Sequence, residues 1–196
     1  MTAEVELLET PTGPVADVKP SPAVEGETLA SALPQDDAVL RRHLRTFALW
    51  AILTLIVDQL SKVWIRAALS LGDEVPVLPG WVHLSHVLNR GAAWGMLSGQ
   101  RLFLIGVTVV VIWVVSVWAR EVVRRGAMAR IGLGLILGGA VGNLIDRLRF
   151  GAVTDFIDLD TPVEWLRTFP VFNVADSALT VGVTLLLIGM IFHRRI

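Results

Sequence analysis

Four long runs of apolar residues, separated by shorter polar stretches, dominate the pattern along the chain. They cover about residues 46–69, 101–119, 131–148 and 174–192. Each run approaches the roughly 20 residues that an α-helix needs to cross the hydrocarbon core of a bilayer. The pattern therefore predicts a mainly α-helical membrane protein with four transmembrane helices.

The segment between the first and second runs has a different periodicity. Apolar Val82 and Leu84 alternate with polar neighbours, which is typical of a half-buried strand. Prolines and glycines punctuate this segment. We expect a small antiparallel β-sheet at the membrane surface in this segment, and we expect residues 149–173 to be short and irregular.

Composition agrees with a membrane protein. Of the 196 residues, 54% are hydrophobic, whereas soluble domains average about 45–50%. The chain has no cysteine, which excludes disulfides, a thiol nucleophile and cysteine metal sites.

The first 40 residues differ from the rest. They contain five prolines, no aromatic residue and eight of the 18 acidic residues of the chain. Such a segment buries too little apolar surface to offset the entropy of ordering. We predict a disordered acidic tail over residues 1–40 and a four-helix transmembrane domain over residues 41–196. A regulatory or partner-binding role for the tail stays open.

Basic residues indicate the orientation. They cluster before the first run, between the second and third runs, and after the fourth run. The clustered residues are Arg41, Arg42, Arg45, Arg120, Arg124, Arg125, Arg130, Arg194 and Arg195. Because cytoplasmic segments are enriched in Lys and Arg, we expect both termini in the cytoplasm and residues 70–100 and 149–173 on the opposite side.

Ionisable groups inside the apolar runs require a partner or a task, since they are costly in hydrocarbon. Asp58 and Lys62 are four residues apart and can pair on one helix face. Asn143, Asp146 and Arg147 share a face near the end of the third run. A purely structural pairing and a place in a functional site are both compatible with these positions.

Two further carboxylates flank the third and fourth runs on the same side of the membrane. Asp155 follows the third run, where it could be one of several loop charges. Asp176 stands three residues after Asn173, a spacing in which Asn173 caps the fourth helix and Asp176 complements its dipole. If the two carboxylates meet, one keeps a proton and the pair can hydrolyse an amide by general acid–base catalysis. We predict Asp155 and Asp176 as catalytic residues.

A metal site is a weaker hypothesis. His83 and His86 have a spacing compatible with metal binding on a turn, but on a strand they point to opposite faces. No third ligand is evident in the sequence. We therefore expect no metal and no other cofactor.

Five ordered motifs make the chain similar to a known family. These are Asp58-Gln59-Leu60-Ser61-Lys62, Asn89-Arg90-Gly91-Ala92-Ala93-Trp94-Gly95, Gly139-Ala140-Val141-Gly142-Asn143-Leu144-Ile145-Asp146-Arg147, Val153-Thr154-Asp155-Phe156 and Phe172-Asn173-Val174-Ala175-Asp176-Ser177. In this order on four apolar runs, they resemble bacterial lipoprotein signal peptidases, also called signal peptidase II, over about residues 46–193.

The resemblance implies an aspartyl endopeptidase of the bacterial cytoplasmic membrane. It would cut prolipoproteins on the amino side of a lipid-modified cysteine, at the extracytoplasmic face. The small sheet cradle of the family falls on about residues 72–98, and its catalytic pair falls on Asp155 and Asp176. Residues that hold substrate or support the site fall on Asp58, Lys62, Asn89, Arg90, Asn143, Asp146, Arg147 and Asn173.

Other hypotheses follow from the residues alone. The intramembrane charges could form the pathway of a small transporter or channel, although the densest polar cluster lies at one membrane face. A noncatalytic scaffold would use Asp176 as a cap only. The expected partners are lipid-modified prolipoproteins and membrane lipids, with no nucleic acid, and the expected state is a monomer.

Overall fold

The computed structural model of the protein describes residues 23–91 and 99–193, with side chains over residues 36–91 and 99–192. Contacts divide the chain into two units, residues 1–36 and 37–196. The second unit carries the functional groups discussed below.

Four helices of the structure are long and apolar enough to cross a membrane. They are α1 (Ala23–Ala68), α2 (Arg101–Val122), α3 (Ala127–Phe150) and α5 (Val174–His193). A 3-10 turn, η2 (Val123–Arg125), follows α2, and a short helix, α4 (Glu164–Arg167), precedes α5. The prediction of a mainly helical, four-span membrane protein is confirmed.

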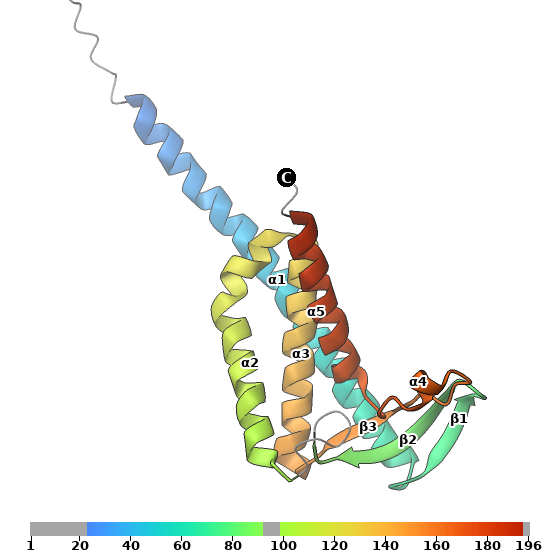
Figure 1. The fold of residues 1–196 in the computed structure, drawn as a ribbon. Coiled ribbons are helices and arrows are strands. Elements are labelled where there is room, and N and C mark those ends of the chain that lie inside the picture. The colour runs from blue at the N-terminus through green and yellow to red at the C-terminus, as the bar shows by residue number, and fades with distance from the viewer. Residues whose placement is uncertain (1–22, 92–98, 194–196) are drawn as a thin grey trace, which may run out of the picture. The chain divides into compact units, whose positions relative to one another are not determined.

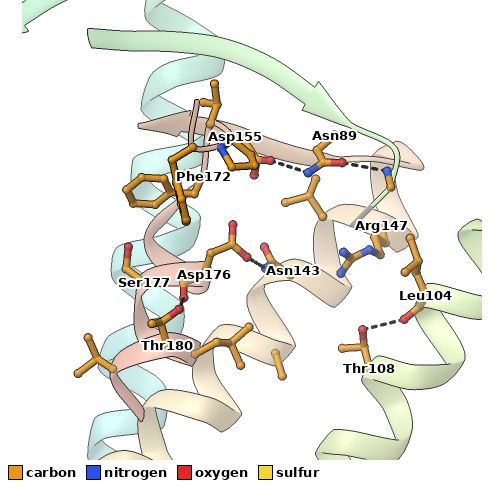
Figure 2. Close-up of a pocket in the computed structure, with 18 of the residues that line it drawn as sticks. Asn89, Leu104, Thr108, Asn143, Arg147, Asp155, Phe172, Asp176, Ser177 and Thr180 are labelled. Carbon is orange, nitrogen blue, oxygen red and sulfur yellow. Dashed lines mark hydrogen bonds between the residues drawn. The ribbon is translucent and has the colours of Figure 1, made fainter. Parts of the chain in front are cut away.

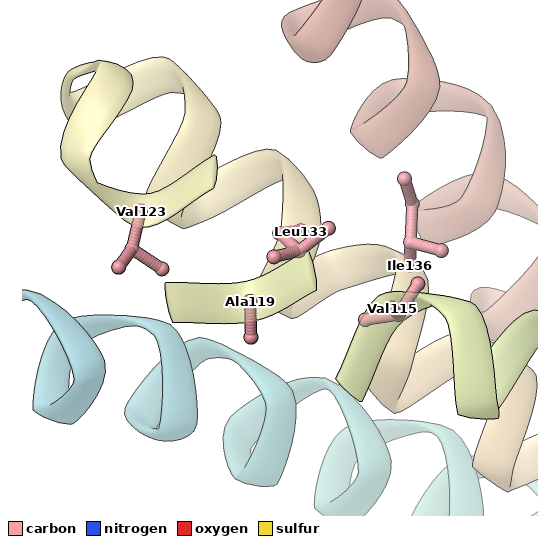
Figure 3. Packing of buried hydrophobic residues seen from close by; sticks show 5 residues of the cluster. All are labelled: Val115, Ala119, Val123, Leu133 and Ile136. Atoms are coloured by element: carbon pink, nitrogen blue, oxygen red, sulfur yellow. The ribbon is translucent and has the colours of Figure 1, made fainter. Parts of the chain in front are cut away.

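The helix α3 lies between the others (Figure 1). A buried apolar cluster joins its first half to α2 and η2 (Figure 3). The cluster consists of Val115, Ala119, Val123, Leu133 and Ile136. Most other apolar side chains of the four helices are exposed, as expected for surfaces that face lipid.

Glycines on α3 allow neighbouring helices to approach its backbone. A Cβ atom at Gly134 or Gly138 would lie 2.7 or 2.5 Å from a backbone carbonyl oxygen of α1. On another face, a Cβ atom at Gly139 would lie 2.6 Å from the carbonyl oxygen of Ala175 in α5. The stripe of small residues therefore packs α3 against α1, which is the role that such stripes have in membranes.

Gly142 continues this stripe and meets the carboxylate of Asp58 rather than backbone. We expect Gly142→Ala to destabilise the protein by about 1–3 kcal/mol, because the added methyl group overpacks a buried charged contact. Thermal unfolding in detergent measures the effect. Gly106→Ala on α2 is the matched control, since nothing lies within 4 Å of a Cβ atom there; an equal loss of stability in both variants would contradict the close approach.

A three-stranded antiparallel sheet in the order β1-β2-β3 lies at one end of the helices, here called the sheet end (Figure 1). Its strands are β1 (Glu74–Leu78), β2 (Val82–Asn89) and β3 (Val153–Asp158). The first two lie in the predicted cradle segment, residues 72–98, of which residues 92–98 lie outside the described residues.

The third strand was not expected, and the prediction that residues 149–173 are irregular is wrong in this part. Four consecutive residues of β3, Val153–Phe156, are buried. They therefore do not show the alternation that marks a half-buried strand. Pairing with β2 and a bridge from Ile157 to Phe172 supply the backbone partners of the strand.

The predicted disordered tail also differs from the structure where the two can be compared. Residues 1–22 lie outside the described residues, but α1 begins at Ala23. Residues 23–40 are therefore helical. Ala, Glu and Leu are frequent in this segment and favour helix, and a helix nucleated by the adjoining span extends at little cost.

Candidate active site

A cavity of about 740 Å³ opens at the sheet end of the helices. Its walls come from α2, α3, α5, β3 and the segment around α4, and its lining is mostly apolar. The polar groups in it include Asn89, Asn143, Arg147, Asp155 and Asp176 (Figure 2). A largely apolar cavity with a few converging polar groups is the usual form of a binding site.

The first turn of α5 places Asp176. The backbone N–H of Asp176 donates to Asn173 Oδ1 at 2.9 Å, and the backbone N–H of Asn173 donates to Asp176 Oδ2 at 3.2 Å. This reciprocal arrangement is a capping box in which Asn and Asp take the two roles. The predicted cap is confirmed, and it orients the Asp176 carboxylate at the positive end of the helix.

Asp155 lies on β3 with 2% of its surface exposed. Asn173 Nδ2 donates to Asp155 Oδ1 at 2.6 Å, and Asn89 Nδ2 donates to Asp155 Oδ2 at 2.9 Å. The orientation of both amides is fixed by donors on their oxygen atoms. The Gly91 N–H donates to Asn89 Oδ1 at 2.9 Å, and the capping N–H of Asp176 does the same for Asn173.

Asn143 on α3 holds the other carboxylate. Its Nδ2 donates to Asp176 Oδ1 at 2.8 Å, while its Oδ1 accepts a bond of 2.8 Å from Lys62 Nζ. An ammonium group only donates, so Lys62 fixes which end of the Asn143 amide faces Asp176. The three asparagines thus direct amide donors at both carboxylates, which face the same space in Figure 2.

Behind this layer, Lys62 sits among buried acidic groups. Its Nζ lies 2.9 Å from Asp58 Oδ2 and 3.6 Å from Asp146 Oδ2, and all three side chains are fully buried. Asp58 Oδ1 accepts the N–H of Ala175 in the first turn of α5 at 3.0 Å. The four-residue pairing of Asp58 and Lys62 is confirmed, and it ties α1, α3 and α5 together behind the cavity.

The environment of Asp155 favours its protonated form. Burial raises the pKa of Asp155 from its ordinary value of 3.8 to about 7, and the nearby Asp176 carboxylate adds to this effect. The amide donors of Asn89 and Asn173 oppose the shift in pKa. A proton on Asp155 is therefore available near neutral pH.

The two predicted arginines differ in position. Arg147 lines the cavity near the sheet end of α3 (Figure 2). Arg90 is exposed and is not among the described residues that line the cavity. The structure thus brings nine of the ten predicted site residues into the cavity or the network behind it, and leaves Arg90 outside.

Several residues around the site were not predicted from the sequence. Arg66 donates to the Thr154 hydroxyl, and Gln59 donates to the Gly142 carbonyl oxygen. The position of Arg66, one turn beyond Lys62, could have drawn attention to it. The segment around α4 also contributes apolar residues to the cavity, such as Trp165 and Phe169. The local sequence around them does not indicate that they lie at a site.

The histidines of the cradle have other partners than a metal. His83 Nδ1 contacts Glu74 Oε1, and His83 Nε2 lies 3.5 Å from Asp160 Oδ2. The Nδ1 atom of His86 bonds to the Leu69 carbonyl oxygen at 2.9 Å. Within the described part of the chain, no three His, Asp or Glu residues are grouped so that they could hold a metal ion.

Comparisons with known proteins agree on one family. A family model described as "Signal peptidase (SPase) II" matches residues 50–192. The chain is 44% identical over 140 residues to the lipoprotein signal peptidase of Moorella thermoacetica, covering 71% of this chain and 89% of that protein. It is 39% identical over 160 residues to that of Geobacter metallireducens, covering 80% and 96%. A solved bacterial membrane enzyme is similar with a TM-score of 0.70 and 34% identity, covering 76% of this chain and 90% of that one.

Proposed function

The chain belongs to the signal peptidase II family, and from that premise we propose that it removes the signal peptide of lipid-modified prolipoproteins with Asp155 and Asp176 as its catalytic pair. The observation that carries this proposal is the shared cavity of the two carboxylates, with an asparagine amide donating to each. Membership of a protease family disfavours the transporter and the scaffold hypotheses.

In the proposed mechanism, a water molecule lies between the two carboxylates and the scissile carbonyl group. The ionised Asp176 takes a proton from the water, while protonated Asp155 donates to the carbonyl oxygen. The resulting tetrahedral intermediate collapses when Asp176 gives its new proton to the leaving nitrogen and the ionised Asp155 takes back a proton from a hydroxyl group of the intermediate. Each carboxyl group thereby acts once as acid and once as base.

The contacts of the two groups favour this assignment of the proton. Asp176 lies in the first turn of α5, where the helix dipole stabilises negative charge. It also accepts bonds from the Asn143 amide and the Asn173 backbone. Asp155 is more deeply buried, which favours its neutral form.

The walls of the cavity fit a lipid-modified peptide. Apolar residues of α2 and α5 line it as well, among them Val107, Val111 and Leu179. We infer that the substrate's acyl chains and signal helix lie along these residues, while Arg147 holds a peptide carbonyl group. Because basic residues concentrate away from the sheet end, the proposed orientation has both termini in the cytoplasm and the active site at the extracytoplasmic face.

Cleavage of a defined precursor by the purified protein tests the function. The substrate is a prolipoprotein whose cysteine carries a diacylglyceryl group, and the control is the same precursor without lipid. We expect one cut on the amino side of the modified cysteine and little cleavage of the control. Equal cleavage of the two precursors would contradict lipid-dependent recognition, and no cleavage of either would contradict the function.

The pH dependence of cleavage follows from the proton on Asp155. Its pKa of about 7 means that the protonated form is lost as pH rises through neutrality. We expect kcat to fall as pH rises above about 7. A profile of kcat between pH 5 and 9 at saturating substrate measures this, and a rate that climbs steadily to pH 9 would rule out Asp155 as the acid.

The same shift in pKa has a consequence for stability. Between pH 4 and 7, roughly, folded Asp155 keeps a proton that the unfolded chain has released, so its contribution to the free energy of unfolding falls as pH rises through this interval. Thermal unfolding of the protein and of Asp155→Asn across this interval isolates that contribution. The difference between the two should change with pH in this window and level off above it.

A further inference from the structure

We propose that Arg66 is a positioning residue that holds Asp155 in place through the side chain of Thr154. The inference rests on the proposed function, because it concerns the geometry of the same carboxylate pair. Arg66 lies at the end of α1, outside the cavity lining, and acts from behind strand β3.

Thr154 is the direct neighbour of Asp155 and is fully buried. Two of its polar atoms are held by different helices. Its hydroxyl accepts a bond of 2.8 Å from Arg66 Nη1 on α1, and its backbone N–H donates to Asp146 Oδ2 on α3 at 2.9 Å. Successive side chains of a strand point to opposite faces, so holding Thr154 from one face orients Asp155 on the other.

The strand needs such support because β3 is at the edge of the sheet. On one side β2 pairs with it, through a register that shifts between Leu84 and Val87. On the other side, the backbone bonds that the described residues make to β3 join Phe172 to Phe156 and Ile157, beyond Asp155. At Thr154, hydrogen bonds to Arg66 of α1 and Asp146 of α3 therefore replace the bonds that a second neighbouring strand would supply.

Arg66 is itself held in one position. Its guanidinium carbon lies 4.6 Å from the centre of the Phe150 ring, and its Nη1 lies 3.7 Å from Asp146 Oδ1. That oxygen is buried and accepts no hydrogen bond from the described residues. Arg66 thus lies between the two groups that hold the strand. It donates to the Thr154 hydroxyl, and it places a positive charge near Asp146, which accepts the Thr154 N–H.

The test compares Arg66→Met, Thr154→Val and the double variant in the cleavage assay with lipid-modified precursor. Each single variant removes the hydrogen bond between Arg66 and Thr154, so that Asp155 is held less firmly, and we expect each to lower kcat about tenfold. KM should change less than twofold, because neither residue lines the cavity. The double variant should be little worse than either single variant, since both remove the same bond.

Arg149→Met is the matched control. Its guanidinium carbon also lies over the Phe150 ring, at 5.3 Å, but among the described residues Arg149 makes no hydrogen bond to β3. We expect its kcat to equal that of the unaltered protein. Thr154→Val keeps the shape of the buried side chain, so it still tests the proposal if Arg66→Met lowers the yield of folded protein.

Three results would overturn the inference. The first is an unchanged kcat in both single variants, and the second is a change in KM alone. The third is a fall in kcat that is additive in the double variant and parallels the fall in melting temperature of the variants. The unaltered protein separates this inference from the proposed function. If it cleaves the precursor while the variants match it, only the role of Arg66 is wrong; if it does not cleave, the proposed function is wrong as well.

Discussion

Asp155→Asn and Asp176→Asn are each expected to lower the rate of prolipoprotein cleavage by about a thousandfold or more. General acid–base catalysis by a positioned side chain contributes about 10²–10⁴-fold, and each carboxyl group of the pair serves in both proton transfers. An amide at either position can neither take a proton from water nor donate one of comparable acidity. Single-turnover cleavage of the lipid-modified precursor measures the loss.

Both variants should remain folded, so that the loss is one of chemistry. The amide has the size of the carboxylate, and at position 176 its oxygen can still accept the N–H of Asn173. The amide donor of Asn143 or Asn89 would then face another donor, at a cost of about 1–3 kcal/mol. A melting curve in detergent checks that the helices stay assembled.

Asp158→Asn is the matched control for this experiment. Asp158 lies on the same strand as Asp155, three residues further along, but its carboxylate lies 3.5 Å from Ser85 Oγ and outside the cavity lining. We expect Asp158→Asn to keep its cleavage rate. Cleavage at a near-normal rate by Asp155→Asn or Asp176→Asn would contradict the assignment of the pair.

Lys62→Met is expected to destabilise the protein by about 3–5 kcal/mol. This is the usual cost of removing one partner from a buried ion pair, because the remaining charge has no compensation. Here two fully buried carboxylates, those of Asp58 and Asp146, would lose the ammonium group between them. Unfolding in detergent, followed by circular dichroism, measures the change.

Cleavage should fall in the same variant even where it is folded. Without the Lys62 ammonium group on its oxygen, the Asn143 amide keeps only the longer bond of 3.2 Å from Asn173 Nδ2 and is less firmly held with its Nδ2 toward Asp176. Leu60→Met introduces the same residue on an exposed position of the same helix and should change neither stability nor rate. Asp58→Asn in the Lys62→Met background should recover part of the stability; no recovery would contradict the charge argument.

The sequence predicted the spans well because their signal is local. A run of about 20 apolar residues is costly in water and stable in lipid wherever its neighbours lie. The spacing of Asn173 and Asp176 is likewise local, and the predicted cap is present. Strand β3 escaped prediction because Val153–Phe156 are all buried, so the strand has no alternation of its own and depends on β2 for its partners.

What the sequence by itself determined is therefore the set of elements: four membrane helices, most of the cradle, the pairing of Asp58 with Lys62 and the capped start of α5. Only the tertiary structure decided which polar groups meet. Lys62 and Asn143 are 81 residues apart in the chain, and Arg66 and Thr154 are 88 apart. The spacing of polar residues predicts which face of a helix is polar. What that face contacts is decided by the packing of α3, through its glycines, against α1 and α5. This packing depends on the combined shapes of several helices, which the sequence of one helix does not reveal.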